Sequence, residues 1–254
     1  MRIPANEVID GEIYTFVNLL GKGAFGTVYK CKNSKGQFVA IKRIMGGGEE
    51  SALEAKIMRQ LNRPEFEQYF VQCHKIFQSV DGAICIVMEY CSGGSLEAFV
   101  KRVGKIDRNS ASTFLAQLVK GVQKLHTIGL MHRDLKPANI LIGRVGVQIR
   151  LKIADFGISK DIPDCSTFLT QCGTPCYMAP SRYDKSADVF SLDVDIQNIL
   201  TDLKGHSHSS ISGRMMCKRK EERLKLDEIE IQNKNQFFLL KTRNCIICGR
   251  ILSK

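Results

Sequence analysis

The hydrophobic period of the chain changes once from strand-like to helix-like, and this change constrains the fold more than any other feature. Up to Tyr90, short β-rich segments separated by turns predominate, interrupted by one amphipathic helix expected at residues 49–61. After Gly93-Gly94 the period is helical, with helices expected at 95–103 and 109–125. The sequence predicts an α+β chain whose strand-rich and mostly helical parts join near residues 91–94. Strands are expected at 12–20, 27–32, 38–44, 70–77, 84–88, 140–142 and 151–153.

The strand-rich part carries a glycine motif, Gly21-x-Gly23-x-x-Gly26, with β-rich segments on both sides. A dinucleotide fold would place a helix after such a motif, so this one predicts a hairpin instead. Glycines let a backbone lie against phosphates without a side-chain clash. The next strand holds Lys42, and the helix after it holds Glu54 on a face able to reach that lysine. Glu54 has an alternative role in a capping box with Ser51, as Ser51-x-x-Glu54.

Three further motifs follow in the helical part: His132-Arg133-Asp134-Leu135-Lys136-Pro137-Ala138-Asn139, Asp155-Phe156-Gly157, and the segment 173–180 that begins Gly-Thr-Pro. In this order and spacing, the motifs resemble the signature set of the eukaryotic protein kinases. The resemblance implies a bilobal protein-kinase-like fold, with the kinase domain at 12–229, its N-lobe at 12–90 and its C-lobe at 91–229. Residues 230–254 would form a basic C-terminal tail.

The resemblance implies ATP and Mg²⁺ as cofactors and protein hydroxyl groups as acceptors. Lys42, held by Glu54, would bind the α- and β-phosphates, and Lys136 would neutralise the γ-phosphate. Asp134 would accept the proton of the attacking hydroxyl. Asn139 and Asp155 would supply hard oxygen ligands to Mg²⁺. The resemblance also assigns the surroundings of the nucleotide: the covering glycines Gly21, Gly23 and Gly26, the apolar Leu20, Val28, Ala40 and Leu141, the gatekeeper Met88, and the hinge residues Glu89 and Cys91.

The kind of acceptor and its regulation also follow from the resemblance. The lysine two residues after Asp134, Lys136, and the Gly-Thr-Pro motif resemble the corresponding motifs of serine/threonine kinases rather than those of tyrosine kinases. Arg133 precedes the catalytic aspartate, where the family typically pairs an arginine with a phosphorylated activation loop. Thr170 matches the usual position of that phosphate and Thr167 is second, so an upstream activating kinase is an expected partner, beside ATP and protein substrates.

The chain departs from the family pattern in the C-lobe. The family motif Ala-Pro-Glu has serine, Ser181, in place of its glutamate here. The arginine that normally pairs with this glutamate is present, at Arg223. The segment around Asp188, which resembles the anchor of the catalytic loop, follows residue 180 too closely. We expect segments of the C-lobe to be missing after 180 and after 192. The alternatives are therefore a kinase-shaped ATP-binding scaffold with little or no turnover, and a nonfunctional truncated product.

Charge and cysteine content add narrower expectations. The 254-residue chain carries a net charge of +11, and residues 200–254 hold 12 lysines and arginines against 6 acidic residues. Few aromatic residues interleave with these charges, so nucleic-acid binding is not expected. No signal peptide or transmembrane segment is expected, and the 10 cysteines fit reduced thiols in the cytoplasm, or alternatively the nucleus. The pair Cys245-x-x-Cys248 is half a zinc site without a convincing second half.

Overall fold

The structure is a computed structural model that describes residues 6–9, 12–23, 26–45, 49–104, 106, 108–146, 148–157, 160–161, 188 and 191. The chain divides into two compact units, Met1–Ser92 and Gly93–Lys254. The boundary falls where the hydrophobic period of the sequence changes. Several predicted features lie outside the described residues: the threonines at 167 and 170, Ser181, Arg223, the shortened segments, the tail at 230–254 and its cysteine pair.

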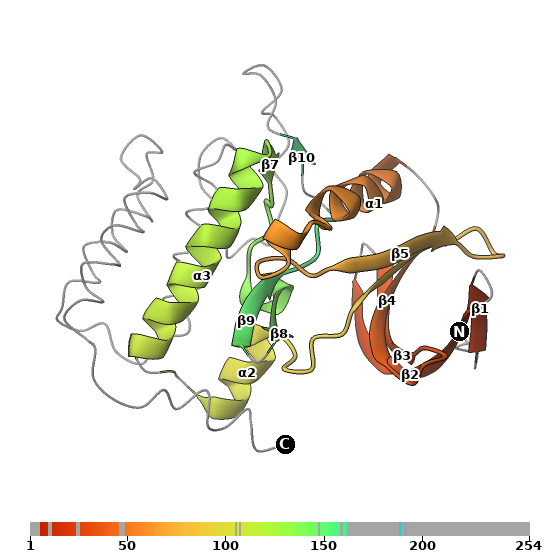
Figure 1. The fold of residues 1–254 in the computed structure, drawn as a ribbon, viewed down its shortest axis with the longest axis horizontal. Coiled ribbons are helices and arrows are strands. Elements are labelled where there is room, and N and C mark those ends of the chain that lie inside the picture. Colours follow the sequence, from red (N-terminus) through yellow and green to blue (C-terminus); the bar gives the residue numbers. More distant parts are fainter. Residues whose placement is uncertain are drawn as a thin grey trace. The chain divides into compact units, whose positions relative to one another are not determined.

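The first unit is built on a six-stranded antiparallel sheet (Figure 1). Its strands are ordered β1-β2-β3-β4-β6-β5, so β6 lies between β4 and β5. Helix α1 and a short 3-10 helix at Pro64–Phe66 complete the unit, and α1 lies beside β5. The strands are β1 (Asn6–Ile9), β2 (Glu12–Gly23), β3 (Gly26–Lys32), β4 (Phe38–Ile44), β5 (Cys73–Gln78) and β6 (Ile84–Glu89), and α1 spans Glu49–Leu61.

Alternating side chains of this sheet form a hydrophobic core on one of its faces. Its buried members are Tyr14, Cys31, Val39, Ile41, Cys85 and Val87. The rings of Phe16 and Tyr29 meet edge to face, 5.2 Å apart, and pack against this core. Because side chains alternate along a strand, the residues between these core members face the other side of the sheet. That other face carries the residues predicted to contact the nucleotide.

Helix α1 has the predicted bounds and buries Ile57, Met58 and Leu61 of its predicted apolar stripe. The capping-box interpretation of its entry is wrong. The helix begins at Glu49, so Ser51 lies inside the first turn and is not the residue that precedes the helix. The carboxylate of Glu54 accepts two hydrogen bonds from Lys42.

Among its described residues, the second unit contains the α-helices α2 and α3, a short 3-10 helix at Pro137–Asn139 and two small antiparallel sheets. The helices are α2 (Leu96–Val103) and α3 (Arg108–Thr127), and the strands are β7 (Leu130–Met131), β8 (Ile140–Val145), β9 (Gln148–Ile153) and β10 (Lys160–Asp161). Ser95 accepts a hydrogen bond from the backbone N–H of Ala98 and caps α2. The apolar residues spaced along one face of α3 are all buried: Ala111, Phe114, Leu115, Leu118, Val122 and Leu125.

Close backbone contacts join the start of the second unit to β8. The N–H of Gly93 donates to the carbonyl of Ile142 at 3.1 Å, and the N–H of Ile142 donates to the carbonyl of Gly94 at 2.8 Å. A Cβ atom at Gly93 would lie 2.6 Å from the Cβ of Ile142. The glycine is therefore required by this close approach, which places Leu141 beside Ser95.

Several elements depart from the sequence prediction, among them β7 and β10, where no strand was expected. Strand β1 pairs with β2, with Asn6 opposite Thr15 and Ile9 opposite Glu12, although no strand was expected there. Strand β5 begins at Cys73 rather than at residue 70. The segment before it is held instead by aromatic packing, with the rings of Phe66 and Phe70 5.7 Å apart.

Candidate active site

The first unit contributes a hairpin and a buried ion pair. Strands β2 and β3 form the hairpin that the glycine motif predicts, with Gly21 opposite Val28 and Gly23 opposite Gly26. A Cβ atom added at Gly21 or Gly23 would meet no atom within 4 Å, so the space beside both glycines is open. Open backbone of this kind fits close approach by a phosphate chain.

The third glycine of the motif has a different role. Gly26 adopts φ +126°, and a Cβ there would lie 2.5 Å from the carbonyl oxygen of Arg43 on β4. Its absence of a side chain is required by the packing of the hairpin against the next strand. Of the three glycines that the motif aligns, the structure therefore shows open space at two and a packing constraint at the third.

Lys42 and Glu54 form the predicted pair. The ammonium Nζ donates to Oε1 at 2.6 Å and to Oε2 at 2.9 Å of the glutamate. Both side chains are almost fully buried, at 7% and 5% exposure. A buried charge needs such a partner because desolvation is costly. The pair fixes the position of the ammonium group on β4.

The predicted adenine-contacting residues of the first unit share one sheet face. Val28 is directly opposite Lys42, and Ala40 is directly opposite Met88. Directly opposed residues of an antiparallel pair lie on the same face. Lys42 and Ala40 alternate along β4, so all four residues line the face opposite the hydrophobic core. Leu20, at the β2 irregularity, is 44% exposed.

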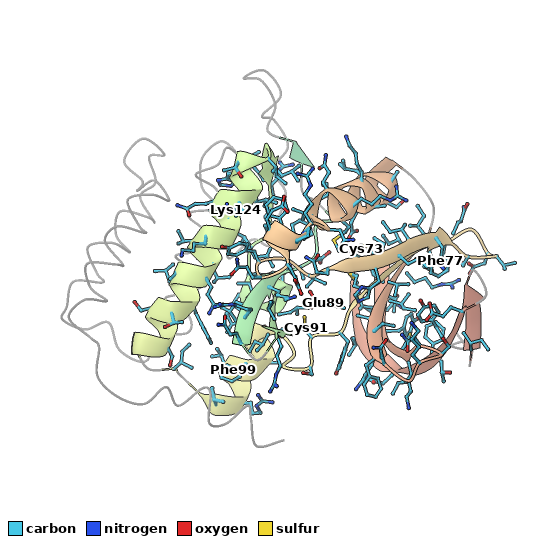
Figure 2. All side chains as sticks on the ribbon, viewed as in Figure 1. Cys73, Phe77, Glu89, Cys91, Phe99 and Lys124 are labelled. Atoms are coloured by element: carbon cyan, nitrogen blue, oxygen red, sulfur yellow. The ribbon has the colours of Figure 1, made fainter. Side chains whose placement is uncertain are left out.

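The predicted hinge residues follow from the end of β6. Glu89 is the last residue of β6, and Cys91 lies two residues further on, 7% exposed (Figure 2). Glu89 is bonded twice to Gln72: its N–H donates to the carbonyl of Gln72 at 3.0 Å, and its Oε1 accepts from the N–H of Gln72 at 2.8 Å. The side chain of Glu89 is thereby directed to the segment before β5.

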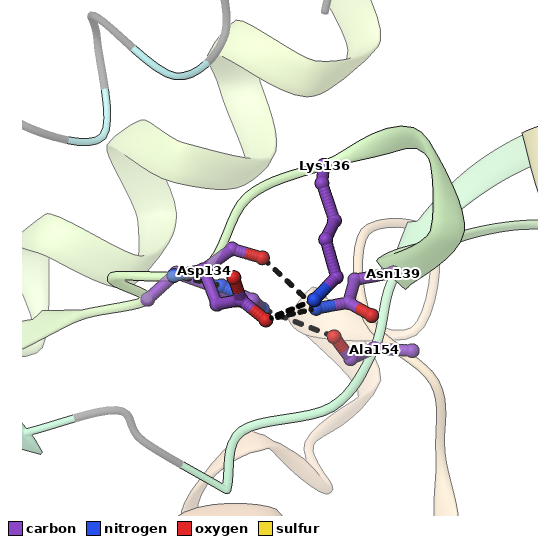
Figure 3. A network of polar contacts seen from close by, with 5 residues as sticks. Asp134, Lys136, Asn139 and Ala154 are labelled. Atoms are coloured by element: carbon purple, nitrogen blue, oxygen red, sulfur yellow. Dashed lines mark hydrogen bonds and ion pairs between the residues drawn. The ribbon is translucent and has the colours of Figure 1, made fainter. Parts of the chain in front are cut away.

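The second unit contributes the segment between β7 and β8. Figure 3 shows Lys136 and Asn139 converging on the carboxylate of Asp134. The ammonium of Lys136 donates to Oδ2 of Asp134 at 2.6 Å, and the Asn139 amide donates to the same oxygen at 3.0 Å. That amide also donates to the carbonyl of Asp134 at 2.9 Å. Because both amide hydrogens of Asn139 face Asp134, its carbonyl oxygen is directed away, as a metal ligand requires.

His132 ties this segment to the strand that leads to Asp155. Its Nδ1 accepts from the N–H of Asp134 at 3.2 Å, and its Nε2 lies 3.0 Å from the carbonyl of Ala154. A backbone N–H donor at Nδ1 and a carbonyl at Nε2 assign the proton to Nε2. The ring also meets that of Phe156, with the ring centroids 5.1 Å apart. Asp155 itself adopts φ 63°, a left-handed conformation that aspartate tolerates.

Asp188 lies later in the chain and accepts hydrogen bonds from the backbone of the same segment, as its predicted anchoring role requires. Its Oδ1 accepts from the N–H of Arg133 at 2.9 Å, and its Oδ2 accepts from the N–H of His132 at 3.1 Å. Nε2 of His126, on α3, lies 2.8 Å from Oδ2. Burial disfavours the carboxylate, but the hydrogen bond to His126 and the backbone donor of Arg133 outweigh it and lower the pKa of Asp188. These contacts support the left-handed backbone of Arg133, φ 70°.

Leu141, the predicted apolar contact in the second unit, is half-buried on β8 and opposes Lys152. The sequence pattern did not single out His126, Ala154 or Gln72, which position the predicted residues. His126 was detectable as a polar residue that continues the buried face of α3, four residues after Val122. The other two act through backbone groups, which no residue type can indicate.

Comparison with known proteins agrees with this arrangement. The family model described as "Protein kinase domain" matches residues 14–242. The chain belongs to this family and has its fold, and members of the family are typically ATP-dependent transferases. Family members generally use ATP and Mg²⁺, and the donor set formed by Asn139 and Asp155 fits Mg²⁺, which usually takes one or two protein ligands together with phosphate oxygens.

The curated relatives include serine/threonine-protein kinases and mitogen-activated protein kinase kinases. The chain is 35% identical over 195 residues to "Probable serine/threonine-protein kinase zyg-1" of Caenorhabditis elegans, covering 74% of this chain and 27% of that protein. It is 33% identical to Mitogen-activated protein kinase kinase 9 of Arabidopsis thaliana, covering 70% and 58%. It is 36% identical to Serine/threonine-protein kinase cds1 of Schizosaccharomyces pombe, covering 74% and 44%. The chain thus matches only part of the length of these relatives.

Proposed function

We propose that this chain is a serine/threonine protein kinase that transfers the γ-phosphate of ATP to protein hydroxyl groups. The observation that carries the proposal is the carboxylate of Asp134, which Lys136 and Asn139 orient through one oxygen. Phosphoryl transfer depends on positioning and charge stabilisation, and a held carboxylate beside an ammonium group supplies both. The names of the relatives and the lysine at 136 favour serine and threonine as acceptors.

Each residue has a defined part in this proposal. Asp134 orients the acceptor hydroxyl and takes its proton, while Lys136 stabilises the negative charge of the transferred group. Lys42, fixed by Glu54, binds the α- and β-phosphates. Asn139 and Asp155 would hold Mg²⁺, which when bound neutralises charge on the phosphate oxygens.

Regulation and location are proposals of the same kind. A phosphate on Thr170, with Thr167 as the second candidate, would pair with Arg133 and order the activation loop after action by an upstream kinase. Protein substrates and a cytoplasmic or nuclear location are proposed from the family and the cysteine usage. Among the residues that the structure describes, no helix is long and apolar enough to span a membrane.

The test is phosphate transfer by the purified full chain. The chain is incubated with radiolabelled ATP, Mg²⁺ and a basic protein such as histone, beside Asp134→Asn and Asp81→Asn. Asp134→Asn is expected to lower kcat by about 10²–10⁴-fold because the general base is lost. Asp81 contacts Arg43 and Ser79 in the β5–β6 turn, so its variant is the matched control for loss of a carboxylate and is expected to keep the activity.

Two outcomes would refute the proposed kinase activity. If transfer does not exceed that of Asp134→Asn while ATP still raises the melting temperature, the chain is a nucleotide-binding scaffold. If the purified chain shows no cooperative unfolding, it is a truncated product. Phosphoamino-acid analysis of the labelled substrate then decides whether serine, threonine or tyrosine carries the phosphate.

A further inference from the structure

A lysine stacked between two aromatic rings joins the nucleotide-facing side of the sheet to the hinge. The ammonium of Lys30 lies 4.0 Å from the ring centroid of Phe38 and 4.5 Å from that of Tyr90. The two rings are 6.0 Å apart and inclined at 58°. Both distances are within the range of cation–π attraction. Lys30, Phe38 and Tyr90, called here the hinge clamp, come from β3, the start of β4 and the residue after β6.

The hinge clamp lies on the face that carries the predicted nucleotide contacts. Lys30 is directly opposite Ala40, and Ala40 is directly opposite Met88. These three residues therefore share one face. Phe38 alternates with Ala40 along β4, so it faces the same way, and its ring is 47% exposed. The clamp continues the row of predicted adenine-contacting residues toward the ends of these central strands.

Tyr90 is the first residue after β6 and follows the last residue of that strand that pairs with β4. The pairing of β4 with β6 ends at Val39 opposite Glu89, so ladder pairs hold residue 89 and not residue 90. Glu89 is fixed from the side of Gln72 by two hydrogen bonds, one of them through its side chain. Successive side chains of an extended segment point in opposite directions. Glu89 is thus held by Gln72, and the side chain of Tyr90, which points in the opposite direction, is held by Lys30.

We propose that the hinge clamp is a positioning device that presets the backbone at 90–91 for the nucleotide base. This inference rests on the proposed ATP-binding function and extends it. None of the three side chains needs to touch the nucleotide, because each acts through the backbone that follows Tyr90. Loss of the clamp frees that backbone, and nucleotide binding must then order it again at a cost in affinity. The chemical step is not involved.

The first experiment separates binding from chemistry in the full chain. Lys30→Met removes the charge and keeps the chain length of the side chain, and Lys30→Arg restores a cation that stacks on aromatic rings. Lys32→Met is the matched control, because Lys32 lies on the same face two residues further along β3, opposite Phe38. Lys30→Met is expected to raise the KM for ATP and the calorimetric Kd about fivefold, with kcat within about twofold. Lys30→Arg is expected to restore both constants, and Lys32→Met to leave them unchanged.

The second measurement does not depend on catalysis or on nucleotide. Hydrogen–deuterium exchange of the peptide that covers 89–93 is expected to be faster in Lys30→Met than in the wild type and in Lys32→Met. Unchanged exchange in Lys30→Met would overturn the clamp, even in a chain that transfers no phosphate. Faster exchange with an unchanged Kd for nucleotide would overturn its role in binding. A fall in kcat with unchanged KM and Kd would also overturn it, because the clamp would then act on the chemical step.

Discussion

The buried pair of Lys42 and Glu54 allows stability and activity to be separated. Its Nζ–Oε1 distance is 2.6 Å, and neither side chain is more than 7% exposed. Removing one partner leaves the other charge buried without its ion-pair partner. Lys42→Met or Glu54→Leu alone is therefore expected to lower the free energy of unfolding by about 3–5 kcal/mol. For a domain of this size, that corresponds to a fall in melting temperature of about 10 °C.

The double variant, Lys42→Met with Glu54→Leu, is expected to regain most of this stability. Two apolar side chains of similar volume replace the ion pair without a stranded charge, and such replacements are often neutral or stabilising. Phosphate transfer is expected to stay lost by about 10²–10³-fold in kcat/KM, because the ammonium that binds the phosphates is absent. The assays are urea denaturation followed by circular dichroism, and transfer from radiolabelled ATP.

The exposed pair Glu97 and Lys101 on α2 is the control for this cycle. Its charged atoms are 3.1 Å apart, but the side chains are 49% and 73% exposed. The same pair of substitutions is expected to show a coupling energy of at most about 0.5 kcal/mol. If the buried pair gave an equally small coupling, or if its double variant were as unstable as the single variants, the reasoning from burial would be refuted.

Three further predictions concern a glycine, an anchor and a phosphate site. Gly26→Ala is expected to cost about 1–3 kcal/mol, because its Cβ would meet the Arg43 carbonyl at φ +126°; Gly21→Ala, in open space, is expected to change unfolding by less than about 1 kcal/mol in the same denaturation experiment. Because the pKa of Asp188 is lowered in the folded chain, its stabilisation is full above about pH 4 and is lost as pH falls through the lower folded value. Asp188→Asn is expected to cost about 3–5 kcal/mol at neutral pH, and the difference from wild type should shrink below about pH 4; a constant difference would contradict this. Thr170→Ala is expected to abolish activation by phosphorylation of the activation loop. If phosphatase treatment left the activity of the wild-type chain unchanged, the pairing of a Thr170 phosphate with Arg133 would be excluded.

Features set by local pattern could be predicted from the sequence. The buried stripe of α3 follows directly from the spacing of its apolar residues, and α1 has the predicted bounds. The motif around Asp134 is also local, since Lys136 and Asn139 reach its carboxylate within the same short segment. Such contacts depend on chain geometry over a few residues, which residue types and spacing largely determine.

Features that depend on distant contacts could not be predicted in this way. Gly26 was assigned to the nucleotide, yet its conformation is required by a carbonyl on the neighbouring strand, at Arg43. The capping box failed because the helix begins at Glu49, before Ser51, while the carboxylate of Glu54 contacts a lysine twelve residues earlier. His126 escaped notice because its partner, Asp188, lies 62 residues away. In each case the sequence gives the chemical group but not the neighbour that the fold places beside it.

The contacts that orient the segment at Asp134 bear on how the shortening expected in the C-lobe should be interpreted. Asp134 is oriented by Lys136 and Asn139, and the backbone before it is held by Asp188 and His126. All of these residues precede position 192, after which the larger departure from the family length is expected. A carboxylate held before substrate arrives needs no reorganisation during the reaction, which is the main electrostatic contribution that a protein can make. The departures therefore remove none of the described groups that orient Asp134, and we expect them to affect stability and substrate docking rather than phosphate chemistry.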